Sequence, residues 1–203
     1  MARRELIPRS GLERLAVSGR FGAPGKVGVT LALRVDLALA SVMARNGRAD
    51  ALAQRIGATF GLDLPMVPRR VAAGPIAFAW AGPGHWLASA EGTEGPVFET
   101  RLRREFPDLA SISDQSDGRV VVRVGGPRAR DALAKGVTID LHPRAFGPGD
   151  AAVTSVAHVG VHLWQIDAAP TYEFAIPRSL AAAFWHWLTE SAAEFGGEIE
   201  PSV

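Results

Sequence analysis

The stretch VAHVGVHLWQID, residues 156–167, admits two very different interpretations. Its histidines, His158 and His162, stand four residues apart, and on a helix both imidazoles would reach one metal ion. Three β-branched valines and a central glycine favour a strand instead. On a strand, four residues span about 13 Å, too far for two parallel side chains to ligate one ion. We therefore predict a strand without a metal site.

The composition narrows the class of protein. The chain has 203 residues, of which 47% are hydrophobic, enough for one large domain or two small ones. Its formal net charge is +1, so it lacks the basic character of a nucleic-acid-binding protein. It has no cysteine, which excludes disulfides, a thiolate nucleophile and cysteine-ligated metal clusters within this chain.

The apolar patterning predicts a cytoplasmic protein. No run of 18 or more apolar residues indicates a membrane span. The segment MARRELIPRSGLERL, residues 1–15, carries basic residues but lacks the apolar region of a secretory signal. We therefore expect a protein of the cytoplasm that makes no membrane contact.

The chain divides into a leader and two similar halves. Residues 1–28 are rich in Arg, Gly and Pro and predict an irregular leader that packs on the second unit or on a partner. Residues 29–109 and 110–203 each read roughly as strand–helix–strand–strand–helix. This order predicts an α+β fold of two ferredoxin-like units, each an antiparallel sheet with helices on one side.

Several segments read as strands or hairpins. Residues 27–39 alternate well enough for one strand, and residues 76–90 predict a hairpin around Gly-Pro-Gly. Residues 151–167 are expected to form one strand paired with residues 171–177.

Two shorter segments read as helices. Helical spacing predicts a helix in residues 47–61, ended by Gly61. A short amphipathic helix is expected in PVFETRLRREF, residues 96–106. Its apolar side would consist of Val97, Leu102 and Phe106.

The strongest helical pattern is SLAAAFWHWLTESAAEFG, residues 179–196, with Ser179 as the expected N-cap and Gly196 as the end. Its apolar arc covers nearly half of the circumference: Leu180, Phe184, Trp185, Trp187, Leu188, Ala192 and Phe195. One packed sheet needs a stripe of about 100°. The excess could cover the core of the second half or a neighbouring chain.

Motifs for catalysis are scarce. GAPGKVGVT, residues 22–30, lacks the glycine spacing of a phosphate-binding loop, and Val27 replaces the hydroxyl residue that binds magnesium. RVGGPRAR, residues 123–130, could hold an anion at a helix start, but its glycine pattern is incomplete. No Gly-x-Ser-x-Gly nucleophile motif exists in the sequence.

Two polar segments remain as candidates. Asp114 and Asp117 flank Ser116, an arrangement that suits an acid–base role or a turn before a strand. The loop DLHPRAF carries three polar groups: Asp140, His142 and Arg144. Polar groups on such a loop are as suitable for docking a partner as for catalysis.

Five stretches, taken in order, cover most of the chain beyond the leader. They are RVDLALASVMARNGRADALAQRIGATFGLDLP (34–65), WAGPGHWLA (80–88), DQSDGRVVVRVGGPRARDALAKGVTIDLHPRAF (114–146), HVGVHLWQID (158–167) and FWHWL (184–188). Together they resemble the gamma subunit family of heterotetrameric sarcosine oxidase. None is a catalytic signature, so the resemblance rests on their joint order.

The resemblance implies a fold, a reaction and a set of partners. The fold would be a truncated form of the folate-binding aminomethyltransferase fold. The complex would demethylate sarcosine oxidatively to glycine, with hydrogen peroxide and either formaldehyde or methylene-tetrahydrofolate as products. FAD, FMN, NAD and tetrahydrofolate would be bound by other subunits. This chain would hold no catalytic, cofactor-binding or metal-binding residue and would assemble with the alpha, beta and delta subunits, chiefly with alpha.

The resemblance also suggests why two histidines share one strand. One face of the strand is aliphatic and is expected to enter the core: Ala157, Val159, Val161 and Leu163. The other carries His158, His162, Trp164 and Ile166, the amphipathic side chains that subunit contacts favour. The predicted interface residues are His142, Arg144, His158, His162 and Trp164. Alternatively, helices of the same chain could cover that face.

Three other functions were weighed against a subunit role. A stand-alone folate-binding protein of the same fold is the main alternative, although the lysine–glycine–cysteine motif of its iron–sulfur-repair group cannot occur without cysteine. A complete aminomethyltransferase would need an additional domain. A nucleic-acid module is disfavoured by the balanced charge.

Overall fold

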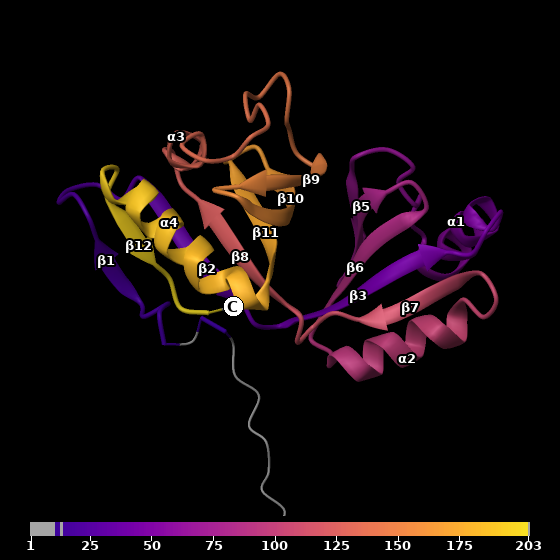
Figure 1. Ribbon diagram of the computed structural model, residues 1–203. Coiled ribbons are helices and arrows are strands. Elements are labelled where there is room, and N and C mark those ends of the chain that lie inside the picture. Colours follow the sequence, from indigo (N-terminus) through magenta and orange to yellow (C-terminus); the bar gives the residue numbers. More distant parts are fainter. Residues whose placement is uncertain (1–10, 13, 203) are drawn as a thin grey trace, which may run out of the picture.

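The computed structural model describes residues 11, 12 and 14–202, which form two halves side by side (Figure 1). One half is built on a seven-stranded sheet. Its strands, in spatial order, are β1 (Gly19–Phe21), β12 (Gly197–Ile199), β2 (Val29–Arg34), β8 (Arg119–Gly125), β11 (Thr171–Pro177), β10 (Val159–Asp167) and β9 (Ala151–Val156). Neighbouring strands are antiparallel except β12 and β2, which pair in parallel.

The other half is built on a five-stranded antiparallel sheet. Its strands, in spatial order, are β4 (Arg70–Ala73), β5 (Ile76–Gly82), β6 (His85–Glu91), β3 (Leu37–Ala44) and β7 (Ala110–Asp114). The predicted hairpin at residues 76–90 is confirmed as β5 and β6.

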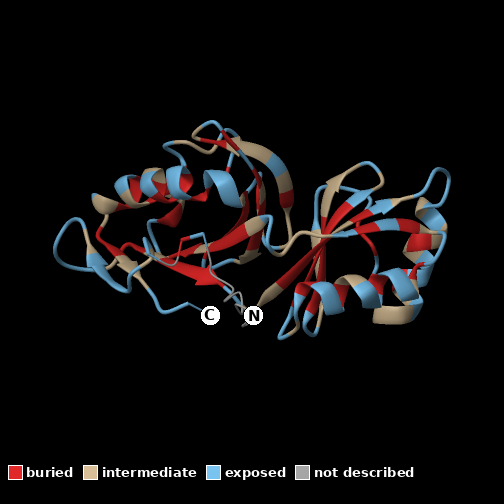
Figure 2. Cartoon of the chain, turned by 60° about the horizontal axis from the view of Figure 1, so that its bottom comes forward, coloured by how far each residue is buried: buried red, intermediate tan, exposed pale blue. Residues whose placement is uncertain are grey.

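Each sheet is covered by helices on one face. The five-stranded sheet packs against α1 (Ala49–Phe60) and α2 (Gly95–Glu105). The seven-stranded sheet packs against α3 (Ala129–Leu133) and α4 (Ala181–Ala193), which follows the 3₁₀ turn η1 (Arg178–Leu180). Buried residues concentrate between helices and sheets in both halves (Figure 2). The predicted α+β class, with antiparallel sheets and helices on one side, is confirmed.

The remaining faces of the two sheets meet each other. A third apolar cluster joins Leu39, Ala79 and Leu87 of the five-stranded sheet to residues of the seven-stranded sheet. The latter are Val121, Ala151, Trp164 and Ala175. We call this side of the seven-stranded sheet its inter-sheet face and the opposite side its helix face.

The chain passes between the two sheets twice. β2 lies in the seven-stranded sheet although it opens the predicted first unit, 29–109. β7 lies in the five-stranded sheet although it opens the predicted second unit, 110–203. Alternation specifies which face of a strand is buried but not which strand it pairs with, so the two sheets divide the chain differently from the expected units.

Two long predicted strands are interrupted by turns. Residues 27–39 contain the whole of β2 and the start of β3, with the crossing between sheets at Val35 and Asp36. Residues 151–167 contain β9 and β10, joined by a turn at Ala157 and His158. Both turn residues have positive φ, 47° and 68°, as two-residue hairpins require, although neither is glycine. The valine-rich segments on either side of this turn read as one continuous strand, so the sequence did not predict the turn.

The leader and the long helix also differ from expectation in detail. Within residues 1–28, β1 pairs with β12, while residues 1–10 and 13 lie outside the described residues. α4 begins at Ala181 with Leu180 as its N-cap, and Ser179 lies in the preceding 3₁₀ turn. Three successive alanines after Leu180 let the helix begin without a side-chain cap.

The apolar arcs of the helices face the chain's own core. Phe184, Trp185 and Leu188 of α4 are buried against the seven-stranded sheet, whereas Leu180 is 43% exposed. In the α2 segment, Leu102 and Phe106 are buried as predicted, but Val97 is 58% exposed and Phe98 is buried in its place. α1 ends as predicted, because Gly61 adopts the left-handed conformation and its N–H binds the Gly57 carbonyl.

Candidate functional site

The two histidines of residues 156–167 occupy different environments. His158 is exposed at the tip of the β9–β10 turn. His162 lies on the inter-sheet face of β10, and its Nδ1 atom is buried without a hydrogen-bond partner. Burial and the nearby Arg119 guanidinium lower the pKa of His162 from its ordinary 6.5 to about 4, so its ring is neutral at pH 7. Among the described residues, no cluster of three or more His, Cys, Asp or Glu could hold a metal ion.

Trp164 is covered by the chain itself. It is only 2% exposed, and its indole N–H donates to Oε2 of Glu173 at 2.8 Å. The guanidinium of Arg70, from the five-stranded sheet, lies 5.8 Å from the indole ring. The cover is the second sheet, not a helix, because the two sheets pack face to face around this residue.

Glu173 is the centre of a buried ionic cluster that sequence reasoning missed. It is 1% exposed, and its Oε1 accepts hydrogen bonds from Arg34 at 2.6 Å and from Arg123 at 2.7 Å. Burial alone would raise the pKa of Glu173, but Arg123 and Arg34 outweigh it and keep that pKa below its usual range. The sequence does carry a sign of this cluster, because charged residues alternate with apolar ones in strands that are otherwise apolar.

The cluster links the two halves through Arg34. Its guanidinium also binds both carboxylate oxygens of Asp36, in the crossing segment, at 2.9 and 3.0 Å. A further bond of 2.7 Å reaches Glu91 at the end of β6. Arg34 therefore joins the seven-stranded sheet, the crossing segment and the five-stranded sheet at one point.

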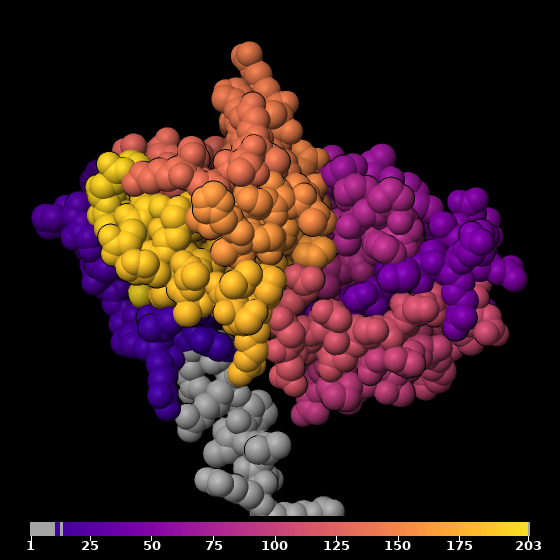
Figure 3. Space-filling model, in the orientation of Figure 1, coloured from indigo at the N-terminus to yellow at the C-terminus, as the bar shows by residue number. Residues whose placement is uncertain are grey.

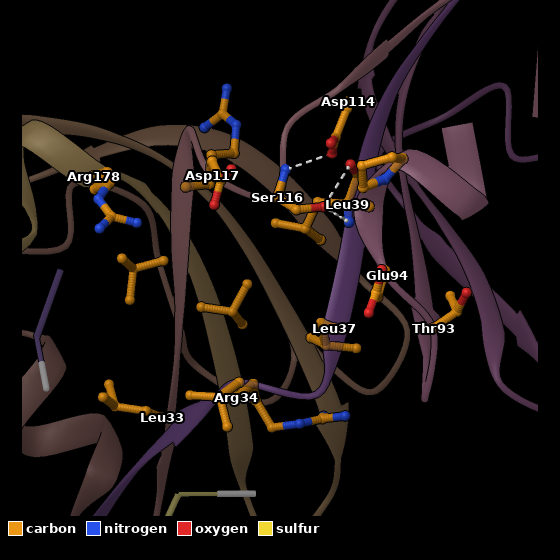
Figure 4. Close-up of a pocket in the computed structure, with 16 residues that line it drawn as sticks. Leu33, Arg34, Leu37, Leu39, Thr93, Glu94, Asp114, Ser116, Asp117 and Arg178 are labelled. Atoms are coloured by element: carbon orange, nitrogen blue, oxygen red, sulfur yellow. Dashed lines mark hydrogen bonds between the residues drawn. The ribbon is translucent and has the colours of Figure 1, made fainter. Parts of the chain in front are cut away.

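A pocket of about 510 Å³ lies between the two halves, beside both chain crossings (Figure 4). Its apolar lining includes Leu33, Leu37 and Leu39. Its polar lining includes Arg34, Thr93, Glu94, Asp114, Ser116, Asp117, Arg119 and Arg178. The acidic candidates identified from sequence therefore lie at a pocket, together with arginines that the sequence did not connect to them.

The Asp114–Ser116 segment has a structural role at this pocket. The Ser116 hydroxyl accepts the Leu39 N–H at 2.9 Å and donates to the Leu39 carbonyl at 3.3 Å (Figure 4). Asp114 accepts the Ser116 N–H at 2.9 Å, and Asp117 is exposed in the following turn. The turn interpretation of this segment is confirmed, and its hydrogen bonds fasten one chain crossing to β3.

Gly95 explains how closely α2 approaches that segment. A Cβ atom there would lie 2.5 Å from the Ser116 hydroxyl and 2.6 Å from both Asp114 carboxylate oxygens. The carboxylate is thus in contact with the start of α2, where helix N–H groups favour negative charge. Asp114 and Ser116 are therefore occupied in joining α2, β3 and the chain crossing.

The glycine pair in residues 123–130 is also structural. A Cβ at Gly126 would lie 2.5 Å from the Gly28 carbonyl, so the backbones touch here. Gly126 has a φ of 103°, which favours glycine. Arg128 pairs with Asp131 at 2.5 Å and lies over the Phe195 ring, so its charge already has a partner.

The remaining predicted residues lie on a projecting loop between α3 and β9 (Figures 1 and 3). His142 and Arg144 are both exposed there. Asp140 accepts the His142 N–H at 2.8 Å, and the His142 ring accepts the Arg144 N–H at 3.2 Å. Phe146 anchors the loop by stacking on Tyr172 at 6.5 Å. The loop presents a histidine and an arginine on a rigid support.

Several polar side chains at or near the pocket already have structural partners. The carboxylates, hydroxyl and arginines closest to the pocket are largely used for turns and for the ionic cluster. Among the helices of the described part, none is both long and apolar enough to cross a membrane. The predicted interface residues do not form one patch: His142 and Arg144 project from a loop, His158 from a turn, and Trp164 is internal.

Comparison with known families gives one clear match. Residues 45–194 match the family described as "Sarcosine oxidase, gamma subunit family". The sequence is 32% identical over 199 residues to the sarcosine oxidase subunit gamma of Corynebacterium sp. strain P-1, covering 95% of this chain and 93% of the relative. It is 33% identical to the corresponding subunit of Corynebacterium sp. strain U-96, covering 84% of this chain and 82% of that relative.

Solved structures extend the comparison to the fold. A chain of the heterotetrameric sarcosine oxidase from Corynebacterium sp. U-96, in complex with pyrrole 2-carboxylate, superposes with a TM-score of 0.78 at 29% identity. That match covers 93% of this chain and 96% of the other. The glycine cleavage system aminomethyltransferase T from Bartonella henselae shares the fold, with a TM-score of 0.67 at 12% identity. This chain spans only 58% of that longer enzyme.

Proposed function

The chain belongs to the sarcosine oxidase gamma subunit family, and from this premise we propose that it is a non-catalytic subunit of a heterotetrameric sarcosine oxidase. The complex demethylates sarcosine to glycine and produces hydrogen peroxide, with the methyl carbon leaving as formaldehyde or methylene-tetrahydrofolate. FAD, FMN, NAD and tetrahydrofolate belong to the alpha and beta subunits. The assembled enzyme works in the cytoplasm.

The observation that carries the proposal is the end-to-end likeness to one chain of a heterotetrameric sarcosine oxidase. The likeness covers 93% of this chain and 96% of the other, so it involves both halves of the fold. The side chains around the inter-sheet pocket support the non-catalytic role. Ser116 and Asp114 hold a chain crossing, and Arg34 is paired with the buried carboxylate of Glu173.

The proposed contact with the alpha subunit uses exposed residues only. His142 and Arg144 project on an anchored loop, and His158 stands at the tip of a hairpin. Because the loop is already anchored, its backbone loses less conformational entropy when a partner binds. Trp164 has no comparable surface, so its contribution to assembly is the positioning of Glu173 rather than a direct contact.

The test compares the isolated chain with the assembled enzyme. Purified alone, the chain is expected to be colourless and to consume no oxygen with sarcosine. Co-expressed with the other three subunits, it should co-purify in a yellow complex that consumes oxygen when sarcosine is added. Turnover by the isolated chain, or a flavin retained by it, would contradict the non-catalytic role.

A second arm tests the contact residues. The triple variant His142→Ala, Arg144→Ala, His158→Ala should fold normally and bind the other subunits more weakly. Arg101→Ala together with Arg104→Ala on α2 is a matched control, because both arginines are exposed on a helix of the other half. Equal recovery of the triple variant and the control in the complex would remove these residues from the interface.

A further inference from the structure

The inter-sheet face of the seven-stranded sheet is not fully covered by the five-stranded sheet. At the end of the sheet nearest the β9–β10 turn, Val153 is 50% exposed and Gly160 is exposed. Val153 pairs with His162 and Gly160 with Ser155, so all four residues share this face. A Cβ atom at Gly160 would meet nothing within 4 Å, so the surface above it is open. We call this surface, together with Arg119, the open corner.

Arg119 is the charged residue of the open corner. It lies on β8, two positions before Val121 and therefore on the same face of the sheet. Val121, Ala175 and His162 lie side by side across three neighbouring strands, and Arg119 lies in the adjacent row. It also lines the pocket between the halves. Its positive charge helps to lower the pKa of His162, so the guanidinium lies near the imidazole ring.

Two buried nitrogen atoms at this corner lack partners. Arg119 Nε and His162 Nδ1 are both buried without a hydrogen bond. Within the described part of the chain, Arg119 forms no salt bridge, in contrast to Arg34 and Arg123 on the same sheet. Leaving a buried donor unsatisfied costs about 1–3 kcal/mol, and more for a charged group. Burial also lowers the pKa of Arg119, as expected for a cation without a nearby anion that would offset its loss of solvent.

The acidic residues nearby do not supply that compensation. Asp114 accepts the Ser116 N–H and touches the start of α2. Asp117 and Glu94 line the same pocket but are exposed to solvent. His162 is neutral and cannot pair with a cation by charge. The group that fits the corner is therefore an anionic acceptor from outside the chain.

We propose that Arg119 receives a carboxylate from a partner subunit that docks on the open corner. The inference rests on the proposed function, which supplies the partner subunits. The exposed turn at His158 adjoins the corner, so the docking segment would continue onto the proposed contact surface. An arginine can bind a carboxylate through two parallel hydrogen bonds, which fixes orientation as well as affinity. The exposed Val153 and the open surface at Gly160 give the segment an apolar seat.

The first test removes the cation. Arg119→Met keeps the length of the side chain without its charge. The affinity of the purified chain for the complex of the other three subunits is expected to fall about 10- to 100-fold, as for truncation of one partner of a buried charge pair. Its dependence on salt between 50 and 300 mM NaCl should weaken as well. Arg55→Met is the matched control, because Arg55 is exposed on α1, and should bind like wild type.

The second test introduces a carboxylate of this chain into the open corner. Gly160→Asp would place that carboxylate on the sheet face that Arg119 shares and in space that is open. It should compete with the partner and weaken binding at least tenfold, whereas Gly160→Asn, of the same size, should weaken binding much less. This pair keeps Arg119 and its fold unchanged, so the result does not depend on the stability of Arg119→Met.

The outcomes separate this inference from the proposed function. If wild type assembles and both Arg119→Met and Gly160→Asp bind within twofold of it, the carboxylate contact is wrong and the subunit role stands. Equal weakening by Gly160→Asp and Gly160→Asn means that a partner covers the corner without a carboxylate, which also overturns the inference. If wild type itself does not bind the other subunits, the proposed function fails.

Discussion

The two faces of the seven-stranded sheet are stabilised by different means. On the helix face, Val122, Phe174 and Leu163 are fully buried beneath α4 and its neighbours in a continuous apolar layer. On the inter-sheet face, the same strands present Arg123, Glu173 and a buried indole to the second sheet. Apolar packing tolerates small shifts of a helix, whereas a buried carboxylate between two arginines requires close registration of the three neighbouring strands that carry them, β2, β8 and β11.

The largest effect is expected from removing the charge at the centre of the inter-sheet face. Glu173→Gln would leave Arg34 and Arg123 without their buried counter-ion, so the free energy of unfolding should fall by roughly 3–5 kcal/mol. Urea unfolding measures this. Glu91→Gln is the control, because the Glu91 side chain is 51% exposed and should contribute less than about 1 kcal/mol. Similar losses in both variants would mean that burial does not distinguish the two carboxylates.

Next in size is truncation of the helix face. Leu188→Ala in α4 removes a fully buried side chain and should lower the free energy of unfolding by about 2–4 kcal/mol through lost burial and a cavity. Leu180→Ala removes the same atoms where the residue is 43% exposed, and should cost less than about 1 kcal/mol. If thermal unfolding gave equal losses, the assignment of the buried side of α4 would be incorrect.

A third comparison uses pH to probe the inter-sheet face alone. His162 has a folded-state pKa of about 4 against an ordinary 6.5, so between these values the unfolded chain takes up a proton that the folded chain does not. Stability is fully present above about pH 6.5 and falls as the pH drops to about 4, by roughly 1–3 kcal/mol. The difference between wild type and His162→Gln, measured by urea unfolding from pH 7 to 4, isolates this contribution. A constant difference over that range would contradict it.

The smallest expected effect lies in the turn that joins β9 and β10. Ala157 has a φ of 47°, a region that disfavours side chains with a Cβ atom. Ala157→Gly should therefore raise the free energy of unfolding by about 0.5–1 kcal/mol. Ala152→Gly, in the extended part of β9, should lower it by a similar amount. Destabilisation by both would show that the turn carries little strain.

Sequence reasoning predicted the helix face better than the inter-sheet face. Val159, Val161 and Leu163 alternate as expected and are buried, because alternation reports the apolar side of a strand directly. Trp164 shares its sequence pattern with interface residues, yet it is buried within the chain. The cover comes from residues 39, 79 and 87, and no local pattern links segments so distant in sequence.

The candidate site was predictable only in part. The turn character of residues 114–117 follows from composition, because Asp and Ser bond readily to nearby backbone groups. The pocket beside it depends on where two chain crossings meet, which is a property of topology. In the sequence, Arg119 is simply the residue before a run of three valines. Its significance comes from a missing partner, which only the packed structure reveals.

The order of strands also sets an order of events during synthesis. The five-stranded sheet is complete once residue 114 has left the ribosome, because β7 is its last strand to be made. The seven-stranded sheet must wait for β12 at residues 197–199, which lies between β1 and β2. During translation, β2 therefore remains without one neighbour while nearly the whole chain is produced. The five-stranded sheet can serve as a preformed platform, whereas β1 and β2 stay incompletely paired, and so exposed to chaperones and to partner subunits, until β12 emerges.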